Sequence, residues 1–375
     1  MRKHIIYRYF LFLSLVGLMQ LTLSCSSSSN EIEPLKPEGE DTPLEKDEYT
    51  FMNVEYRKWQ NGTFQAWTTA DSRETRTIDN MNWYTPSSDY SRTAWGGRIG
   101  LQPSSVVGKE GFFRVANCGG RSYLLDPDNG AVIIHGIQHV RPGESTAHKK
   151  AFGTRYGSEA RWSEETGKLL ADNHINYISY GSNRIEVFPA AVRGNLLTPK
   201  TQKIAYAENL YLLRTFMWDM SKNLGYAFDD DKYNRLVLLF EPTFPTYIDR
   251  LVQEKSALFA GDRHFIGFYL DNELPFASYQ GTGYANTEGG GWLVHTQKNR
   301  GEFYQNFCLR LLETRNCVGW VHFEYNDGYD SNGKASNKGV VSIEYEPYES
   351  FLSQMRQLNL SVHSLIDYYD IKSVQ

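Results

Sequence analysis

The sequence predicts an α/β fold built on parallel strands and preceded by a smaller β-rich region. Near-continuous apolar runs, the pattern of parallel strands covered on both faces, alternate with stretches of helical character. The apolar runs are 131–140, 174–180, 235–240, 264–270 and 317–325, and the helical stretches include 205–223, 244–258 and 299–314. This alternation predicts right-handed parallel units in either an open sheet or a (β/α)8 barrel.

The first 25 residues have the three parts of an export signal. Basic residues within the first eight positions precede an apolar run over 9–23, and small residues follow before Cys25. An apolar run of about 15 residues is shorter than the roughly 20 that an ordinary membrane span requires. We therefore expect the leader to be removed, with a retained helical anchor as the alternative.

Residues 26–48 are rich in Ser, Pro and acidic side chains and resemble the disordered tether of a bacterial lipoprotein. The resemblance implies that Cys25 is the lipidated N-terminus of an exported protein. Such a protein would be anchored to the outer membrane, at the cell surface or on the periplasmic face. The segment Thr22-Leu23-Ser24 departs from the usual lipobox, which has Leu three positions before the cysteine.

The composition favours a sugar partner over nucleic acid. Aromatic residues make up 14% of the chain and include 25 Tyr, while the net charge is −5. Flat rings with a polar edge can stack on the apolar faces of sugar rings, and the lack of a basic excess argues against nucleic acid. An aromatic-rich core without a sugar role is the alternative. No glycine-rich phosphate loop follows a predicted strand, so we expect no nucleotide cofactor.

Residues 49–127 are predicted to be rich in short strands and loops. Four tryptophans lie among short polar runs there, and no helical period persists. Residues 112–115 and 122–130 suggest a hairpin with a Pro-Asp-Asn-Gly turn. The barrel-type domain is expected to follow, over residues 128–375.

The segment 266–276 carries the most informative chemistry. An apolar strand ends there in Asp271-Asn272-Glu273 and is stopped by Pro275. Catalytic groups of a barrel lie at the carboxyl ends of its strands, where a carboxylate in a partly apolar cleft can act as a general acid. The alternative is that these polar residues only cap a loop.

Asn272-Glu273 after an apolar strand is similar to the fourth-strand motif of clan A glycoside hydrolases. The chain resembles the β-agarase/porphyranase-type enzymes of families 50 and 86, in order, over roughly 112–370. The segments that carry this resemblance are 119–128, 135–143, 268–276, 317–320, 336–339 and 345–348. It implies a (β/α)8-type (TIM) barrel, Glu273 as acid/base, Asn272 on the sugar 2-hydroxyl, and a β-linked galactan or similar polysaccharide as the substrate.

The second carboxylate of a retaining mechanism, about 5–5.5 Å from the first, is not found at its usual place on a seventh strand. About 40 residues separate Glu273 from Cys317, whereas three strand–helix units need about 90. Strands five to seven are therefore expected to be missing and the barrel incomplete. We expect the strands at 264–270 and 317–325 either to pair directly or to leave a gap partly filled by residues 277–294.

Glu324 on the last predicted strand remains the candidate second carboxylate, ahead of Glu288. Two functions stay open: a retaining glycoside hydrolase, and a catalytically inactive glycan-binding lipoprotein derived from one. A damaged barrel without function is a third possibility.

Further residues are candidate sugar contacts. His135 and His139 share a strand face, but no third ligand has suitable spacing, so we expect no metal site. His139 lies nearer the carboxyl end of its strand. Alternation places Trp320, His322 and Glu324 on one face, which could line the barrel mouth. The candidate substrate-binding residues are Asn272, His139, Trp292, His322 and Tyr325.

Overall fold

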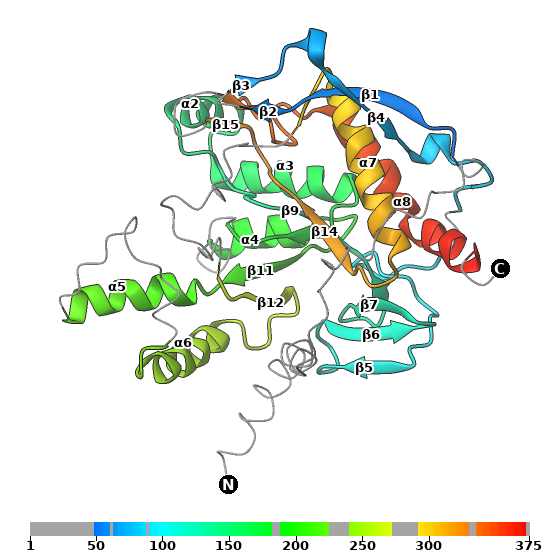
Figure 1. The fold of residues 1–375 in the computed structure, drawn as a ribbon. Coiled ribbons are helices and arrows are strands. Elements are labelled where there is room, and N and C mark those ends of the chain that lie inside the picture. The colour runs from blue at the N-terminus through cyan, green and yellow to red at the C-terminus, as the bar shows by residue number, and fades with distance from the viewer. Residues whose placement is uncertain are drawn as a thin grey trace, which may run out of the picture. The chain divides into compact units, whose positions relative to one another are not determined.

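The computed structural model describes residues 49–60, 63–87, 90–181, 188–224, 240–271, 292–329 and 335–372 (Figure 1). The chain divides into two units, residues 1–46 and 47–375, and the described residues all belong to the second unit. The leader, Cys25, the tether, Asn272, Glu273 and Glu288 lie outside the described residues. Within the described part, no helix is both long enough and apolar enough to cross a membrane.

A parallel sheet forms the centre of the described unit. Its strands are β9 (Ile134–Ile137), β10 (Tyr177–Ile178), β11 (Ala205–Asn209), β12 (Phe265–Tyr269) and β14 (Gly319–His322). Their spatial order is β12-β11-β10-β9-β14, and each neighbouring pair is parallel. The prediction of a mixed α/β fold with parallel strands is confirmed.

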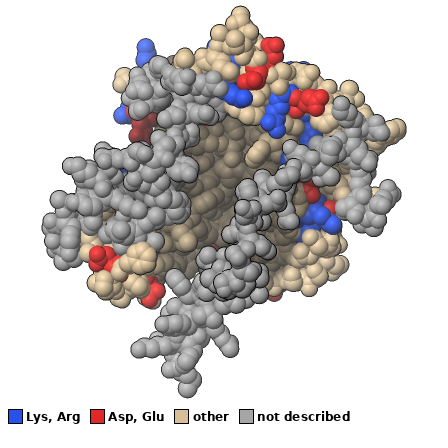
Figure 2. All heavy atoms as spheres, in the orientation of Figure 1, with Lys and Arg blue, Asp and Glu red and all other residues tan. Residues whose placement is uncertain are grey.

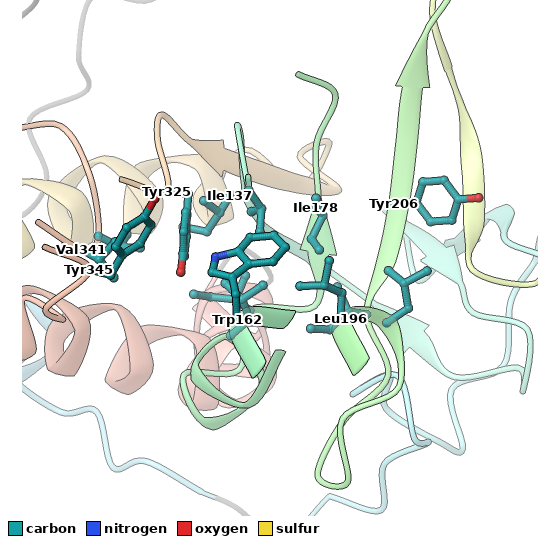
Figure 3. Packing of buried hydrophobic residues seen from close by; sticks show 14 of the residues in the cluster. Ile137, Trp162, Ile178, Leu196, Tyr206, Tyr325, Val341 and Tyr345 are labelled. Carbon is teal, nitrogen blue, oxygen red and sulfur yellow. The ribbon is translucent and has the colours of Figure 1, made fainter. Parts of the chain in front are cut away.

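Helices cover one face of this sheet, which we call the outer face. They are α2 (Thr146–Arg155), α3 (Glu159–Asp172), α4 (Ala190–Leu197), α7 (Gln297–Glu313) and α8 (Glu349–Lys372). Helices α5 (Leu212–Leu224) and α6 (Phe244–Leu258) pack on each other in a separate cluster. Strand residues Ile137, Ile178 and Tyr206 pack there in one buried cluster with Trp162 of α3 and Leu196 of α4 (Figure 3). Ser158 caps α3, since its side chain accepts a hydrogen bond from the Arg161 amide.

The third strand lies where the sequence predicted a helix. We expected a helix over 205–223, but the chain forms β11 first and α5 only from Leu212. Ala205 and Ala207 pack on one side of β11 with Tyr177, while Tyr206 packs on the other with Phe259. Alanine has a high helix propensity, and burial on both faces removes the alternation that marks a half-exposed strand. The strand predicted over 235–240 lies outside the described residues, apart from Phe240.

Short antiparallel sheets connected by loops form residues 49–132. One sheet has the order β13-β1-β4, from Leu293–Val294, Met52–Arg57 and Asp71–Thr75. Another follows the chain through β5 (Ser105–Val107), β6 (Arg114–Cys118), β7 (Arg121–Leu125) and β8 (Ala131–Val132). The small pairs are β2 (Trp59–Gln60) with β3 (Thr63–Phe64), and β15 (Gly328–Tyr329) with β16 (Ala335–Ser336); 3-10 helices span Trp67–Thr69 and Ile78–Asn80.

The predicted hairpin turn joins a different pair of strands from the one expected. Gly119 and Gly120, with φ of 60° and 80°, connect β6 to β7. The Pro-Asp-Asn-Gly segment connects β7 to β8, and Asp126 Oδ1 accepts hydrogen bonds from the amides of Asp128 and Gly130. The turn chemistry was therefore predicted and its partner strands were not.

The two strands on which the catalytic expectation depends lie at opposite edges of the parallel sheet. In the described residues β12 pairs with β11 and β14 pairs with β9, so no direct pairing of β12 with β14 is found. Between Asp271 and β14, the described residues contribute β13, which pairs with β1, and helix α7. Residues 277–291, which were expected to fill part of a gap, lie outside the described residues.

Candidate functional site

The carboxyl ends of β9 and β14 are joined by backbone hydrogen bonds. The Gln138 amide donates to the His322 carbonyl at 3.0 Å, and the Tyr325 amide donates to the Gln138 carbonyl at 3.0 Å. These bonds extend the parallel pairing beyond the last strand residues. His139 and Glu324, which follow the two strands, are thereby brought together.

His139 and Glu324 form the centre of the candidate site. His139 Nδ1 lies 2.9 Å from Glu324 Oε2, and the exposed fractions of the two side chains are 25% and 16%. Because a carboxylate only accepts, Nδ1 carries the proton of this bond, and Nε2 of a neutral ring is left as an acceptor. The ring of Phe323 packs edge-on against His139, with centroids 4.9 Å apart.

The position of His139 depends on a glycine in the next loop. Gly181 has φ of +78°, and a Cβ at this position would lie 2.3 Å from Cδ2 of His139. His139 itself has φ of 57°, a left-handed conformation that is uncommon for residues other than glycine. Close approach of the Gly181 backbone therefore helps to hold the imidazole against Glu324.

The face of the sheet opposite the helices, which we call the inner face, is hollowed. A Cβ on Gly136 would lie 2.6 Å from the Tyr177 ring and 3.1 Å from Val321, so these three residues share this face. Figure 2 shows the hollow over β9, β11 and β14, with an uncharged floor. Val321 and Phe323 of the edge strand β14 are 37% and 43% exposed.

Three tyrosines and a serine line the carboxyl ends of β10 and β12. The hydroxyls of Tyr177 and Ser179 each lie 3.4 Å from the hydroxyl of Tyr269, and the ring of Tyr180 lies 4.5 Å from that of Tyr269. Burial, followed by the neighbouring Tyr269, raises the pKa of Tyr177, so its hydroxyl stays protonated. This hydroxyl cluster was missed from the sequence, although its residues end two predicted strands.

The first residue of the Asp271-Asn272-Glu273 motif has a structural role. Asp271 Oδ2 accepts a hydrogen bond of 2.8 Å from the amide of Leu213, in the first turn of α5. The alternative expectation, that a polar residue at this strand end caps a loop or helix, thus holds for Asp271. Asn272 and Glu273 follow directly in the chain, outside the described residues.

His322 and Trp320 point away from the hollow, which corrects the expectation that their face lines it. His322 Nε2 donates to the Lys338 carbonyl at 3.0 Å, and burial, with the nearby Arg300, lowers the pKa of His322 to about 4. Trp320 is 7% exposed and its indole NH donates to the Tyr304 hydroxyl at 2.6 Å. Trp320 and His322 instead pack against helices α7 and α8 on the outer face. The residues that alternate with them, Val321 and Phe323, face the hollow.

Two expected stacking residues lie elsewhere. Tyr325 is 1% exposed and its hydroxyl bonds to Thr166 at 2.9 Å, so in this structure it is a core residue (Figure 3). Trp292 is 46% exposed and stacks on Tyr56 of β1 at 4.1 Å. None of the contacts in the described residues joins Trp292 to the His139–Glu324 pair.

His135 lies at the opposite end of β9 from His139. It is 4% exposed, stacks on Trp320 at 5.0 Å, and donates from Nδ1 to the His174 carbonyl at 3.3 Å. Burial lowers the pKa of His135 to about 3, so the ring is neutral. Within the described ranges, no group of three or more His, Cys, Asp or Glu side chains could hold a metal ion.

Comparison with known proteins reveals a fold relationship. No family model and no curated protein matches the sequence. The crystal structure of BpGH50 superimposes with a TM-score of 0.68 at 18% identity, over 86% of this chain and 96% of that one. The agarase AgWH50C gives 0.46 at 13%, over 75% and 67%, and an exo-β-agarase gives 0.41 at 11%, over 75% and 69%. The predicted resemblance is confirmed at the level of the fold, which this chain shares with BpGH50.

Proposed function

We propose that this protein binds a β-linked galactan or a similar polysaccharide in the hollow of an incomplete (β/α)8-type barrel, without cleaving it. The observation that carries this proposal is that His139 engages Glu324, the candidate second carboxylate, while β12 and β14 lie at opposite edges of the sheet that the described residues form. The fold likeness to BpGH50 supports the derivation from a hydrolase scaffold.

The contacts of Glu324, the candidate second carboxylate, favour a binding role over a nucleophilic one. The nucleophile of a retaining hydrolase lies about 5–5.5 Å from the acid/base and attacks the sugar with a carboxylate oxygen. Glu324 Oε2 is engaged by His139 Nδ1 at 2.9 Å. This contact supports a role for Glu324 in holding a ligand together with His139 rather than in attacking a sugar.

The groups around the hollow suit a neutral glycan. Sugar hydroxyls both donate and accept, and the site offers a carboxylate, an imidazole and the hydroxyl of Tyr269. The half-exposed ring of Phe323 next to His139 supplies an apolar face for a sugar ring.

A matched pair of variants tests this proposal. Phe323→Ala removes an exposed ring at the site, whereas Phe307→Ala removes a ring that is 63% exposed on α7. We expect Phe323→Ala to weaken binding to a galactan about tenfold or more in isothermal titration calorimetry, and Phe307→Ala to leave it unchanged. If both variants bound the galactan as tightly as the wild type, the glycan would not bind in the hollow, and the proposal would be contradicted.

A second function, glycoside hydrolysis, is favoured by the rank of β12. Among the described residues it is the fourth strand of the parallel sheet along the chain, and Asn272-Glu273 follows its end in the sequence, as the resemblance requires. If hydrolysis is detected, Glu273→Gln should abolish it for unactivated glycans, because the leaving oxygen loses its proton donor. Substrates with good leaving groups should suffer less, and equal losses on both kinds would assign Glu273 another role.

We also propose that the protein is exported and anchored through Cys25 to the outer membrane. The leader and the tether-like segment 26–48 support this proposal. A Cys25→Ser protein should leave the membrane fraction and appear in the soluble one. Continued partition of Cys25→Ser with membranes would contradict a lipid anchor.

A further inference from the structure

A small polar cavity lies at the amino-terminal base of the parallel sheet, remote from the His139–Glu324 pair. It encloses about 10 Å³, which is close to the smallest volume that holds one water molecule. Its wall comes from β9, the residues just before β10 and β11, the loop around Gly96, and helix α8. The lining includes Arg92, His135, His174, Gln202, Asn359 and His363.

Four buried polar atoms in this wall have no hydrogen-bond partner among the described residues. They are His135 Nε2, Gln202 Nε2, Asn359 Oδ1 and His363 Nδ1. Their residues are between 1% and 8% exposed, so bulk solvent does not satisfy these atoms. Buried polar groups in folded proteins are nearly always hydrogen-bonded, so four in one wall indicate a common ligand.

The hydrogen bonds that His135 and His363 make outside the cavity determine which ring nitrogen of each is an acceptor. His135 Nδ1 faces the His174 carbonyl, so it carries the proton and Nε2 is a lone-pair acceptor. His363 is bonded to the Gly96 backbone carbonyl, and because its Nδ1 has no partner, Nε2 is the donor there. Both rings therefore present acceptors to the cavity.

The two amides complete the pattern. Asn359 Nδ2 donates to the Asn173 carbonyl at 3.0 Å, which leaves Oδ1 as a third acceptor. The hydrogen bond between Gln202 and His174 raises the pKa of His174, so the imidazole donates and Gln202 Oε1 accepts. Gln202 Nε2 is left as a donor to the cavity. The cavity thus presents three acceptors and one donor.

This pattern selects the chemistry of the ligand. An anion would face three lone pairs, and a cation would lie beside the Arg92 guanidinium, which is part of the wall. A neutral molecule that donates twice and accepts at least once fits both the pattern and the volume.

We propose that this cavity is a binding site for a single long-lived water molecule, which ties helix α8 to the base of the sheet. The water accepts from Gln202 Nε2 and donates to the ring acceptors of His135 and His363, so the loss of either ring acceptor removes one of its hydrogen bonds. It is independent of the glycan site, because it lies at the opposite ends of the strands.

Amide isosteres of histidine provide a matched test. A Gln amide takes the place of histidine Nε2, and an Asn amide takes the place of Nδ1. His135→Gln and His363→Asn therefore keep an acceptor in the cavity, whereas His135→Asn and His363→Gln remove it while keeping the outer bond. The variants that keep the acceptor and the variants that remove it each include one change at His135 and one at His363. General destabilisation at one of these positions would therefore affect both kinds of variant and could not produce the expected pattern.

The readouts are a crystal structure and ¹⁷O magnetic relaxation dispersion of the full mature chain. We expect one water peak in the cavity of the wild type, His135→Gln and His363→Asn. In the other two variants its residence time should shorten about tenfold, the equivalent of one hydrogen bond. An empty cavity in the wild type, an anomalous peak there in bromide-soaked crystals, or equal residence times in all four variants would overturn the proposal. The wild-type measurement alone decides the matter if a variant fails to fold.

Discussion

Acidification is expected to destabilise this fold through its buried neutral histidines. Burial lowers the pKa of His135 and of His363 to about 3, and that of His322 to about 4. In the unfolded chain a histidine has a pKa of about 6.5. As pH falls below about 6.5, the unfolded state takes up protons that the native state does not, so stability is lost with falling pH down to about pH 3–4.

The magnitude follows from the same pKa values. Between pH 7.5 and pH 5.0, each of these histidines costs about 2 kcal/mol of unfolding free energy, or about 6 kcal/mol for the three together. That is a large share of the roughly 5–15 kcal/mol that stabilises a typical domain. The groups that face His135 and His363 strengthen the effect, because Arg92 lies close to both and His174 is also buried nearby.

Urea denaturation at pH 7.5, 6.0 and 5.0, followed by tryptophan fluorescence, measures this loss. His363→Gln, which cannot be protonated, should reduce the slope of the unfolding free energy by about 1.4 kcal/mol per pH unit near pH 5. His295→Gln is the control, because the His295 side chain is 44% exposed. A wild-type unfolding free energy that stays constant from pH 7.5 to 5.0, or a His363→Gln slope equal to the wild type, would refute the reasoning.

Two further substitutions, each with a control variant, test the packing. Gly181→Ala places a Cβ 2.3 Å from the His139 ring and should abolish glycan binding. Gly261→Ala has a similar backbone φ of +87° and open space around it, so it should cost only about 1–2 kcal/mol of stability and leave binding intact, as calorimetry and thermal melts can show. Arg121→Ala removes a guanidinium that is fully buried and paired with α8, so urea unfolding should show a loss of about 3 kcal/mol, against less than about 0.5 kcal/mol for the exposed Arg161→Ala. Equal losses for the two arginine variants would contradict the role of burial.

The sequence predicted the elements whose signals are local. Strand β12 lies inside an uninterrupted apolar run, and α6 occupies the predicted range 244–258 with Pro245 in its first turn. Strand β11 was missed because its alanines favour a helix by propensity and its burial is decided by neighbours distant in the sequence.

The site was predicted less completely, because its geometry depends on pairing between distant strands. His139 and Glu324 were each selected as candidates, but nothing local indicates that β14 pairs with β9 and so brings them together. Alternation correctly grouped Trp320 with His322, yet it does not tell which face is covered by helices. For the same reason the tyrosines around Tyr269 were overlooked: their proximity comes from the sheet order alone.

The chain length of a bound polysaccharide after prolonged incubation tests the central claim most directly. A galactan retained by the protein in affinity electrophoresis is incubated with it for days, and the glycan is then sized by light scattering. We predict that the wild type retains the glycan and leaves its chain length unchanged, as Glu273→Gln does. Shortening of the glycan by the wild type and not by Glu273→Gln would contradict the claim and establish a hydrolase.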